Sequence, residues 1–179
     1  MIDVNRAAIV TVVIDRHIQS DHKHLKSLAF SQVDVGYLYR YFDNVNQRLN
    51  HRYQVSMTPA LTLVQNTVYQ LLKGQEVSHQ FYAVPPYKNV DLSNIYTVQK
   101  LCDSLQVDAV IKVTVQYTLQ QGIQSSSFIV AAIFEVYSRH GEVQKFKKIG
   151  SFSQEGTGYN GDVYLRLFHQ SMTHLLNTL

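Results

Sequence analysis

The amino-acid sequence predicts an α/β (α+β) fold in which helices cover a single mixed β-sheet, with the element order β-α-β-α-α-β-β-β-α. Three observations predict it. Hydrophobic residues make up 45% of the 179 residues, enough for a real core. Strand-like runs alternate with helical periodicity in the first half, and three strand patterns follow one another in the last third. No internal repeat or linker is visible, so residues 1–179 are expected to form one domain.

The first half begins with a strand that is expected at the centre of the sheet. Residues 7–14 are rich in β-branched side chains and apolar on both faces, as in a strand buried from both sides. A polar connection, residues 15–32, follows. Apolar residues then recur at steps of three and four over 34–50, which predicts an amphipathic helix. Residues 52–57 alternate between apolar and polar and predict a short strand.

Two further helices are expected before the last third. Thr58-Pro59 is a helix start, with Thr as the cap and Pro in the first position. The buried stripe of this helix is expected to be Leu61, Val64, Val68, Leu71 and Leu72, and Gly74 ends it. Residues 77–87 have no clear period. Asp91 or Ser93 then caps a helix whose buried face is Ile95, Val98, Leu101, Cys102 and Leu105.

The last third predicts a meander of three strands and a final helix. Residues 109–119 alternate as a half-buried strand, and residues 128–137 are apolar on both faces, as in a central strand. A polar loop (120–126) joins them. Residues 138–142 form a hairpin turn with Gly141 at positive φ. Lys145, Lys147 and Lys148 suit an edge or a solvated face of the returning strand, 143–152. After glycine-containing residues 155–161, a helix is expected over 164–176.

Three passages resemble a group of bacterial envelope proteins. These are the opening strand with its polar loop and helix, the run LCDSLQVDAVI at 101–111, and the run IFEVYSRHGEV at 133–143. The chain resembles the curli-transport lipoproteins, the outer-membrane lipoprotein activators of penicillin-binding proteins, and the amino-terminal domain of TolB. It departs from them at Gln106, where the family often has Gly, and at Arg139-His140 before the turn glycine.

The resemblance implies a non-catalytic accessory or assembly protein of the cell envelope that works by binding an envelope protein. It implies a periplasmic or outer-membrane-anchored location in a Gram-negative bacterium, with a lipid anchor upstream of residue 1. The residues alone leave a cytoplasmic location and the oligomeric state open. No cofactor is expected. Twelve tyrosines and only 16% charged residues favour a recognition surface, for which the candidates are Tyr117, Tyr137, Lys145 and Phe146.

The main alternative is a metal-binding protein or a metal-dependent enzyme. His17, His22 and His24 lie in the polar connection together with Asp15 and Asp21. Imidazoles and carboxylates are the usual ligands of zinc, nickel and iron. In an extended segment His22 and His24 would point to the same side. A solvated loop rich in Asp and His explains the same residues.

A nucleic-acid-binding domain is the second alternative. The lysines of 145–148, with Phe146 and Phe152, would form a basic aromatic strip. The net charge is only +3 and no other basic stripe is present, which favours an edge strand without nucleic acid. The glycines of 156–161 lack the strand context of a dinucleotide site. The longest apolar run, 7–14, is far too short to span a membrane, and the single cysteine, Cys102, is expected in the core.

Overall fold

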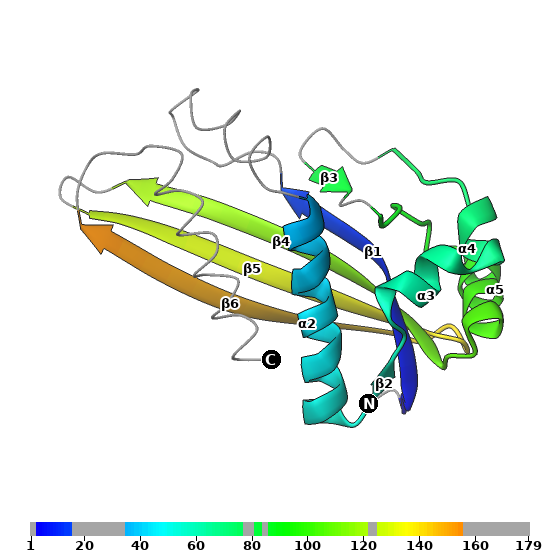
Figure 1. Ribbon diagram of the computed structural model, residues 1–179. Helices are drawn as coiled ribbons and strands as arrows, with labels where there is room; N and C mark the ends of the chain where they lie inside the picture. The colour runs from blue at the N-terminus through cyan, green and yellow to red at the C-terminus, as the bar shows by residue number, and fades with distance from the viewer. Residues whose placement is uncertain (1–2, 16–34, 77–80, 84–85, 122–124, 156–179) are drawn as a thin grey trace.

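The computed structural model describes residues 3–15, 35–76, 81–83, 86–121 and 125–155 (Figure 1). The elements in chain order are β1 (Arg6–Asp15), α2 (Val35–Tyr53), β2 (Ser56–Met57), α3 (Ala60–Gln65), α4 (Thr67–Leu71), β3 (Phe81–Ala83), α5 (Ile95–Leu105), β4 (Ala109–Gln121), β5 (Ser125–Ser138) and β6 (Val143–Glu155).

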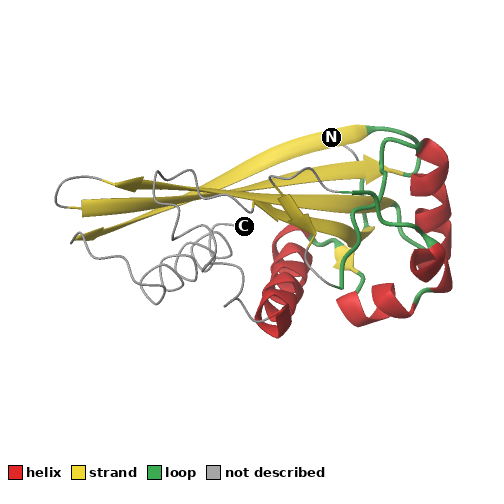
Figure 2. Ribbon diagram, turned by 90° about the horizontal axis from the view of Figure 1, so that it is seen from above, coloured by secondary structure: helices red, strands yellow, loops and turns green. Residues whose placement is uncertain are grey.

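The described strands form one mixed sheet in the order β2-β1-β4-β5-β6, with β3 paired to β1. β1 runs parallel to β2 and β4, whereas β4, β5 and β6 form an antiparallel meander. α2 lies across one face of the sheet. α3, α4 and α5 gather at the end of the sheet where β4 begins (Figures 1 and 2). The predicted fold class, a single mixed sheet with helices against it, is therefore confirmed.

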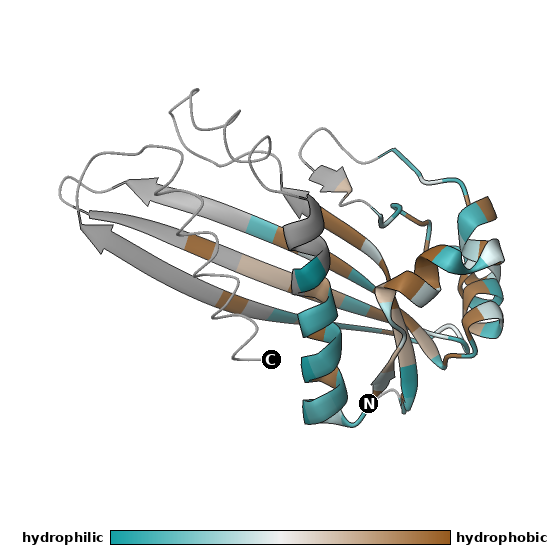
Figure 3. Ribbon diagram, viewed as in Figure 1, coloured by the Kyte–Doolittle hydropathy of each residue, from teal (hydrophilic) through white to brown (hydrophobic). Residues whose placement is uncertain are grey.

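β1 is the buried centre of the sheet, as its sequence predicts. Ala7, Ala8, Val10 and Val12 are fully buried, and the polar Thr11 is buried with them. β1 lies between β4 on one edge and the short strands β2 and β3 on the other. Hydrophobic residues concentrate in this part of the molecule, in β1 and α3, while α2 presents a hydrophilic flank (Figure 3).

A β-bulge interrupts β1 at its most buried point. Ile9 pairs with Ile111 and Thr11 with Lys112, so Val10 between them has no partner in β4. A bulge leaves a backbone group outside the ladder, and a buried group of this kind must find another partner. The Tyr69 hydroxyl donates to the Val10 carbonyl oxygen at 2.7 Å and accepts the Lys88 N–H at 2.8 Å. Tyr69 is itself only 1% exposed.

Lys88 completes this arrangement from the other side of Tyr69. Its ammonium group donates to the carbonyl oxygens of Tyr69, Gln70 and Leu72 at 2.7–2.9 Å. These carbonyls belong to the end of α4, where backbone oxygens lack helical partners and a positive charge is favourable. The ammonium nitrogen also lies 5.4 Å from the centroid of the Tyr69 ring. One lysine therefore caps α4 and holds the segment that follows β3.

The single helix predicted after Thr58-Pro59 is wrong: the chain forms two short helices. Pro59 is the N-cap of α3, and Asn66, in an extended conformation, separates α3 from α4. Asn66 Oδ1 accepts the N–H of Tyr69, which caps α4. A side chain that competes with the helical ladder in this way shifts the buried face. The buried residues are Ala60, Leu63 and Tyr69, while the predicted core residues Leu61 and Leu71 are 59% and 85% exposed.

Other boundaries also differ from the prediction. α2 continues to Tyr53, and Gln54 follows at a φ of 55°, so the strand predicted over 52–57 shrinks to β2. Asn94, not Asp91 or Ser93, caps α5 by accepting the Tyr96 N–H. Part of the unassigned 77–87 segment forms β3. The predicted helix at 164–176 and the glycines of 156–161 lie outside the described residues.

The meander is confirmed, and so is most of the predicted buried face of α5, although its Ile95 and Leu105 are only partly buried. Val98, Leu101 and Cys102 are buried in α5, and burial raises the pKa of the Cys102 thiol to about 11. The loop predicted over 120–126 is shorter, because β4 reaches Gln121 and β5 begins at Ser125. Gly141 has a φ of 92°, and the Ser138 N–H donates to the Glu142 carbonyl, as in a three-residue hairpin loop with a bulge.

Replacing Tyr69 with Phe should destabilise the protein. Tyr69→Phe keeps the ring but leaves the buried Val10 carbonyl and the Lys88 N–H without their hydroxyl partner. Unsatisfied buried groups cost about 1–3 kcal/mol each, so the free energy of unfolding should fall by at least about 1 kcal/mol. Denaturant unfolding measures it. The control is Tyr96→Phe, because the Tyr96 side chain is 77% exposed, and an equal loss in the control would contradict this role.

The buried Tyr69 hydroxyl should also make the free energy of unfolding depend on pH in the alkaline range. A comparison of the wild type with Tyr69→Phe measures this dependence. Burial raises the pKa of Tyr69 from 10.0 to about 12, against a smaller opposing effect of the Lys88 N–H. The stabilisation is present below pH 10.0 and is lost as the pH rises toward about 12, because only the unfolded chain ionises in that window. The wild type should therefore lose more stability across this window than Tyr69→Phe does.

Candidate protein-binding surface

The runs 101–111 and 133–143 meet at one corner of the fold, where Asp108 joins them. The Asp108 carboxylate accepts the N–H groups of Asn5 and Arg6 at 3.0 and 2.9 Å. Its own backbone N–H donates to the Arg6 carbonyl, and its carbonyl accepts the Arg139 N–H. Asp108 thus ties the start of β1, the start of β4 and the β5–β6 hairpin together. The aspartate of the family-like pattern has a structural role here.

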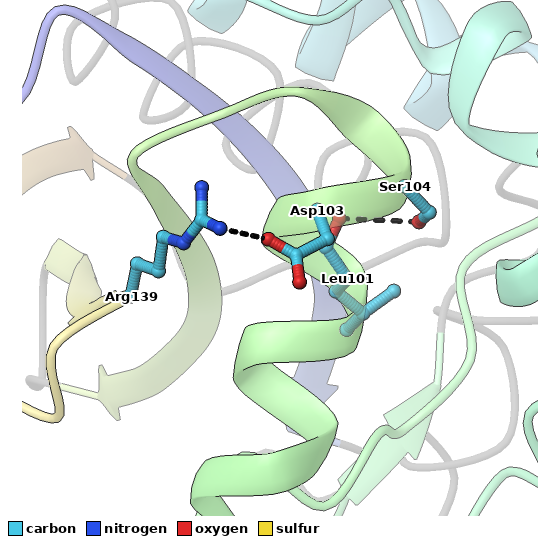
Figure 4. Close-up of polar contacts among 4 residues, drawn as sticks. All are labelled: Leu101, Asp103, Ser104 and Arg139. Carbon is cyan, nitrogen blue, oxygen red and sulfur yellow. Dashed lines mark hydrogen bonds and ion pairs between the residues drawn. The ribbon is translucent and has the colours of Figure 1, made fainter.

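An ion pair between Asp103 of α5 and Arg139 of the hairpin lies at the same corner (Figure 4). Both side chains are more than half exposed, so the pair adds little to stability. Ser104 donates to the Leu101 carbonyl at 3.2 Å, within the last turn of the helix (Figure 4). Gln106 then takes the left-handed conformation, with a φ of 54°. Gly takes this conformation at less cost than other residues, so Gln106 stands at a position that favours Gly.

Among the described residues, the face of the meander that carries Lys112 is the more exposed of the two, and we call it the open face. Side chains of a strand alternate between the two faces. Ile111, Val113, Val115 and Phe134 on one face are buried. The side chains that alternate with these point to the other face, and they are half-buried or exposed except for Val110 and Ala131. The register aligns this set in cross-strand rows: Val110–Tyr137–Val143, Lys112–Glu135–Lys145, Thr114–Ile133–Lys147 and Gln116–Ala131–Ile149.

Charge on the open face is organised around Glu135. Its carboxylate lies 3.2 Å from the Lys145 ammonium, and Lys112 is its register partner on the other side. The Glu135 side chain is 20% exposed and that of Lys145 is 61% exposed. Lys147 is exposed in the next row. Burial, and then the carboxylates of Glu135 and Asp91, raise the pKa of Tyr137. In these rows, Lys112, Lys145 and Lys147 outnumber the acidic Glu135.

β6 forms the outer edge of the described sheet, and the hairpin fixes which of its backbone groups face outward. The Ser138 N–H donates to the Glu142 carbonyl, and pairing continues without a register shift to Glu155. Because antiparallel pairs alternate between bonded and non-bonded positions, alternate residues of β6 turn toward β5. The inward set is Gln144, Phe146 and Lys148, and the outward set is Val143, Lys145, Lys147 and Ile149.

The structure separates the predicted binding residues. Tyr137 and Lys145 belong to adjacent rows of the open face. Phe146 belongs to the opposite face, where it is stacked on Phe134 with ring centroids 5.2 Å apart. Of the basic and aromatic groups proposed for nucleic acid, Lys145 and Lys147 are therefore on the face opposite to Phe146. Tyr117 of β4 pairs with Val130 of β5, but the Tyr117 side chain lies outside the described part of the structure.

Residues that the sequence did not single out complete the surface. Glu135 and Ile149 lie next to the lysines of the open face because of the register between strands. The alternation within one strand does not show this register. The predicted metal ligands His17, His22 and His24 lie outside the described residues. Within the ranges described, no three His, Cys, Asp or Glu side chains are grouped so as to hold a metal ion. None of the described helices is long and apolar enough to cross a membrane.

Comparisons with known proteins found no matching family model and no matching curated protein. Among solved structures, the chain is similar to lipoprotein GNA1162 of Neisseria meningitidis, with a TM-score of 0.43 and 16% identity over 96% of this chain and 98% of that one. It is also similar to hypothetical protein CT253 of Chlamydia trachomatis, with a TM-score of 0.45 and 10% identity over 98% of this chain and 95% of that one.

Reversing the charge of Glu135 should destabilise the sheet. Glu135→Lys places three lysines in one cross-strand row, between Lys112 and Lys145. Like charges directly opposite each other cost about as much as opposite charges gain, so we expect a loss of about 1 kcal/mol in the free energy of unfolding. The loss should shrink as salt is added. The exposed Glu76 gives the control Glu76→Lys, and equal losses in both variants would contradict the charge row.

Proposed function

We propose that this protein is a non-catalytic accessory or assembly protein of the bacterial cell envelope that acts by binding another protein of the envelope. The observation that carries the proposal is the open face together with the β6 edge. A sheet face that keeps exposed apolar, aromatic and charged side chains side by side is suited to recognition. Val143 and Ile149 are 59% and 58% exposed there, on either side of Lys145 and Lys147, and the half-buried Tyr137 pairs with Val143.

The location follows from the sequence resemblance. The runs around Asp108 and Gly141 are those that resemble the envelope lipoproteins and TolB, and they support a periplasmic or outer-membrane-anchored protein. Their contacts with each other give them a role in holding the fold. The binding surface is accordingly expected on β6 beyond the hairpin, at Lys145, Lys147 and Ile149, which lie outside the two family-like runs. That division fits accessory proteins that share a scaffold and differ in partner.

Position-specific photo-crosslinking in cell-envelope extracts tests the proposal. A photoreactive residue at Thr114 or Gln116 lies on the open face, and one at Leu71, which is 85% exposed, lies on α4 as the control. We expect both open-face positions to give the same discrete protein adduct and the control position to give none. Mass spectrometry identifies the adduct. No adduct from either open-face position, or the same adduct from Leu71, would contradict the proposal.

A further inference from the structure

We propose that the outer edge of β6 takes up an extended, acidic segment of the partner protein as an additional strand of the sheet. This inference rests on the proposed binding function and deepens it, because it states how the partner is held and which chemistry it carries. Strand addition satisfies backbone groups of an exposed edge, while alternating side chains give selectivity.

The edge itself provides the first argument. β6 has 13 residues and pairs only with β5 among the described strands. Soluble proteins usually keep edge strands short, or cover them, because unpaired N–H and C=O groups recruit other strands. The outward set of β6 offers such groups at Val143, Lys145, Lys147 and Ile149, at every second residue. A strand of this length left at an edge is suited to a partner strand.

The side chains of the outward set provide the second argument. They all belong to the open face, with Lys145 and Lys147 in the middle and the exposed Val143 and Ile149 on either side. A strand added beside β6 would place its own side chains next to these residues. Acidic residues opposite the two lysines and apolar residues opposite Val143 and Ile149 are therefore complementary. Glu135 neutralises Lys145 only in part, since that lysine remains 61% exposed.

The same charges disfavour a second copy of this chain as the occupant. An antiparallel copy centred on Lys145, on Lys147 or on Phe146 between them would place lysine opposite lysine. Like charges in directly opposed positions are destabilising. Lysines on edges are a common defence against self-pairing, and they leave an acidic strand as the favoured partner.

A synthetic peptide tests this inference directly. The peptide Val-Thr-Glu-Thr-Glu-Thr-Val matches the outward set in either strand direction, because its sequence is symmetric. Binding to the full chain is followed by fluorescence anisotropy of the labelled peptide at low salt. We expect saturable binding that weakens with salt. The controls are Val-Thr-Lys-Thr-Lys-Thr-Val, which reverses the charge, and the acidic peptide with N-methylated backbone at residues 2–6, which keeps the charge but cannot donate backbone hydrogen bonds from these residues in either strand direction; each should bind at least about tenfold more weakly.

Two pairs of variants separate backbone pairing from charge. Ile149→Pro removes one outward N–H, which an edge strand tolerates, and should weaken the acidic peptide about tenfold, whereas Ile149→Thr should have little effect. Lys147→Glu should weaken it about five- to tenfold, and Lys100→Glu, the same change at an exposed position of α5, should not. Circular dichroism and melting curves confirm that each variant is folded.

Several results would overturn the inference. They are no binding of the acidic peptide, equal binding of all three peptides, or binding unaffected by Ile149→Pro. Tighter binding of a single-stranded oligonucleotide than of the peptide would assign the edge to nucleic acid, and a dimer broken by Ile149→Pro in sedimentation would assign it to a second copy. If crosslinks form from Thr114 and Gln116 while the peptide fails, the binding function stands and the strand-addition mode falls.

Discussion

The hydrogen bond from the Tyr69 hydroxyl to the Val10 carbonyl is the interaction on which the arrangement of this fold depends. The bulge in β1 leaves that carbonyl outside the ladder at a fully buried position. Tyr69 supplies the donor, and its oxygen also holds the Lys88 N–H, so a residue of α4 links β1 to the segment before α5. The Lys88 ammonium then closes the end of α4. This connection therefore helps to fix the position of the segments that cover β1.

This connection also determines where the open face lies. The covering segments are held at the β1 end of the sheet, by Tyr69 and by the Val90 N–H that donates to Thr11 Oγ1. Asp108 and the Asp103–Arg139 pair hold the hairpin corner. Within the described residues, the open face is most exposed on β6, beyond this corner. The exposed residues Lys145, Lys147 and Ile149 of β6, which are proposed to bind, do not belong to the buried core, so they can be varied without loss of the core.

Local patterns were enough to predict the strands β1, β4, β5 and β6 and the buried face of α5, because period and β-branching report burial directly. They failed where a side chain competes with the backbone. Asn66 splits a helix by capping the next one, and Gln54 ends α2 in a left-handed conformation. The burial of Tyr69 could not be read locally, since its partner is a bulge 59 residues away. Lys145 and Phe146 are neighbours in sequence, and for that reason both were predicted on one binding surface. Side chains of a strand alternate, so the two residues belong to opposite faces.

Residue-resolved amide hydrogen exchange along β6 tests the central claim most directly, because it reports which backbone groups the edge leaves free. We expect fast exchange at Val143, Lys145, Lys147 and Ile149 and slow exchange at Gln144, Phe146 and Lys148 in the free protein. The first set should become protected when the acidic peptide is added. Equal protection of both sets in the free protein would show that the edge is already covered, and would contradict strand addition at β6.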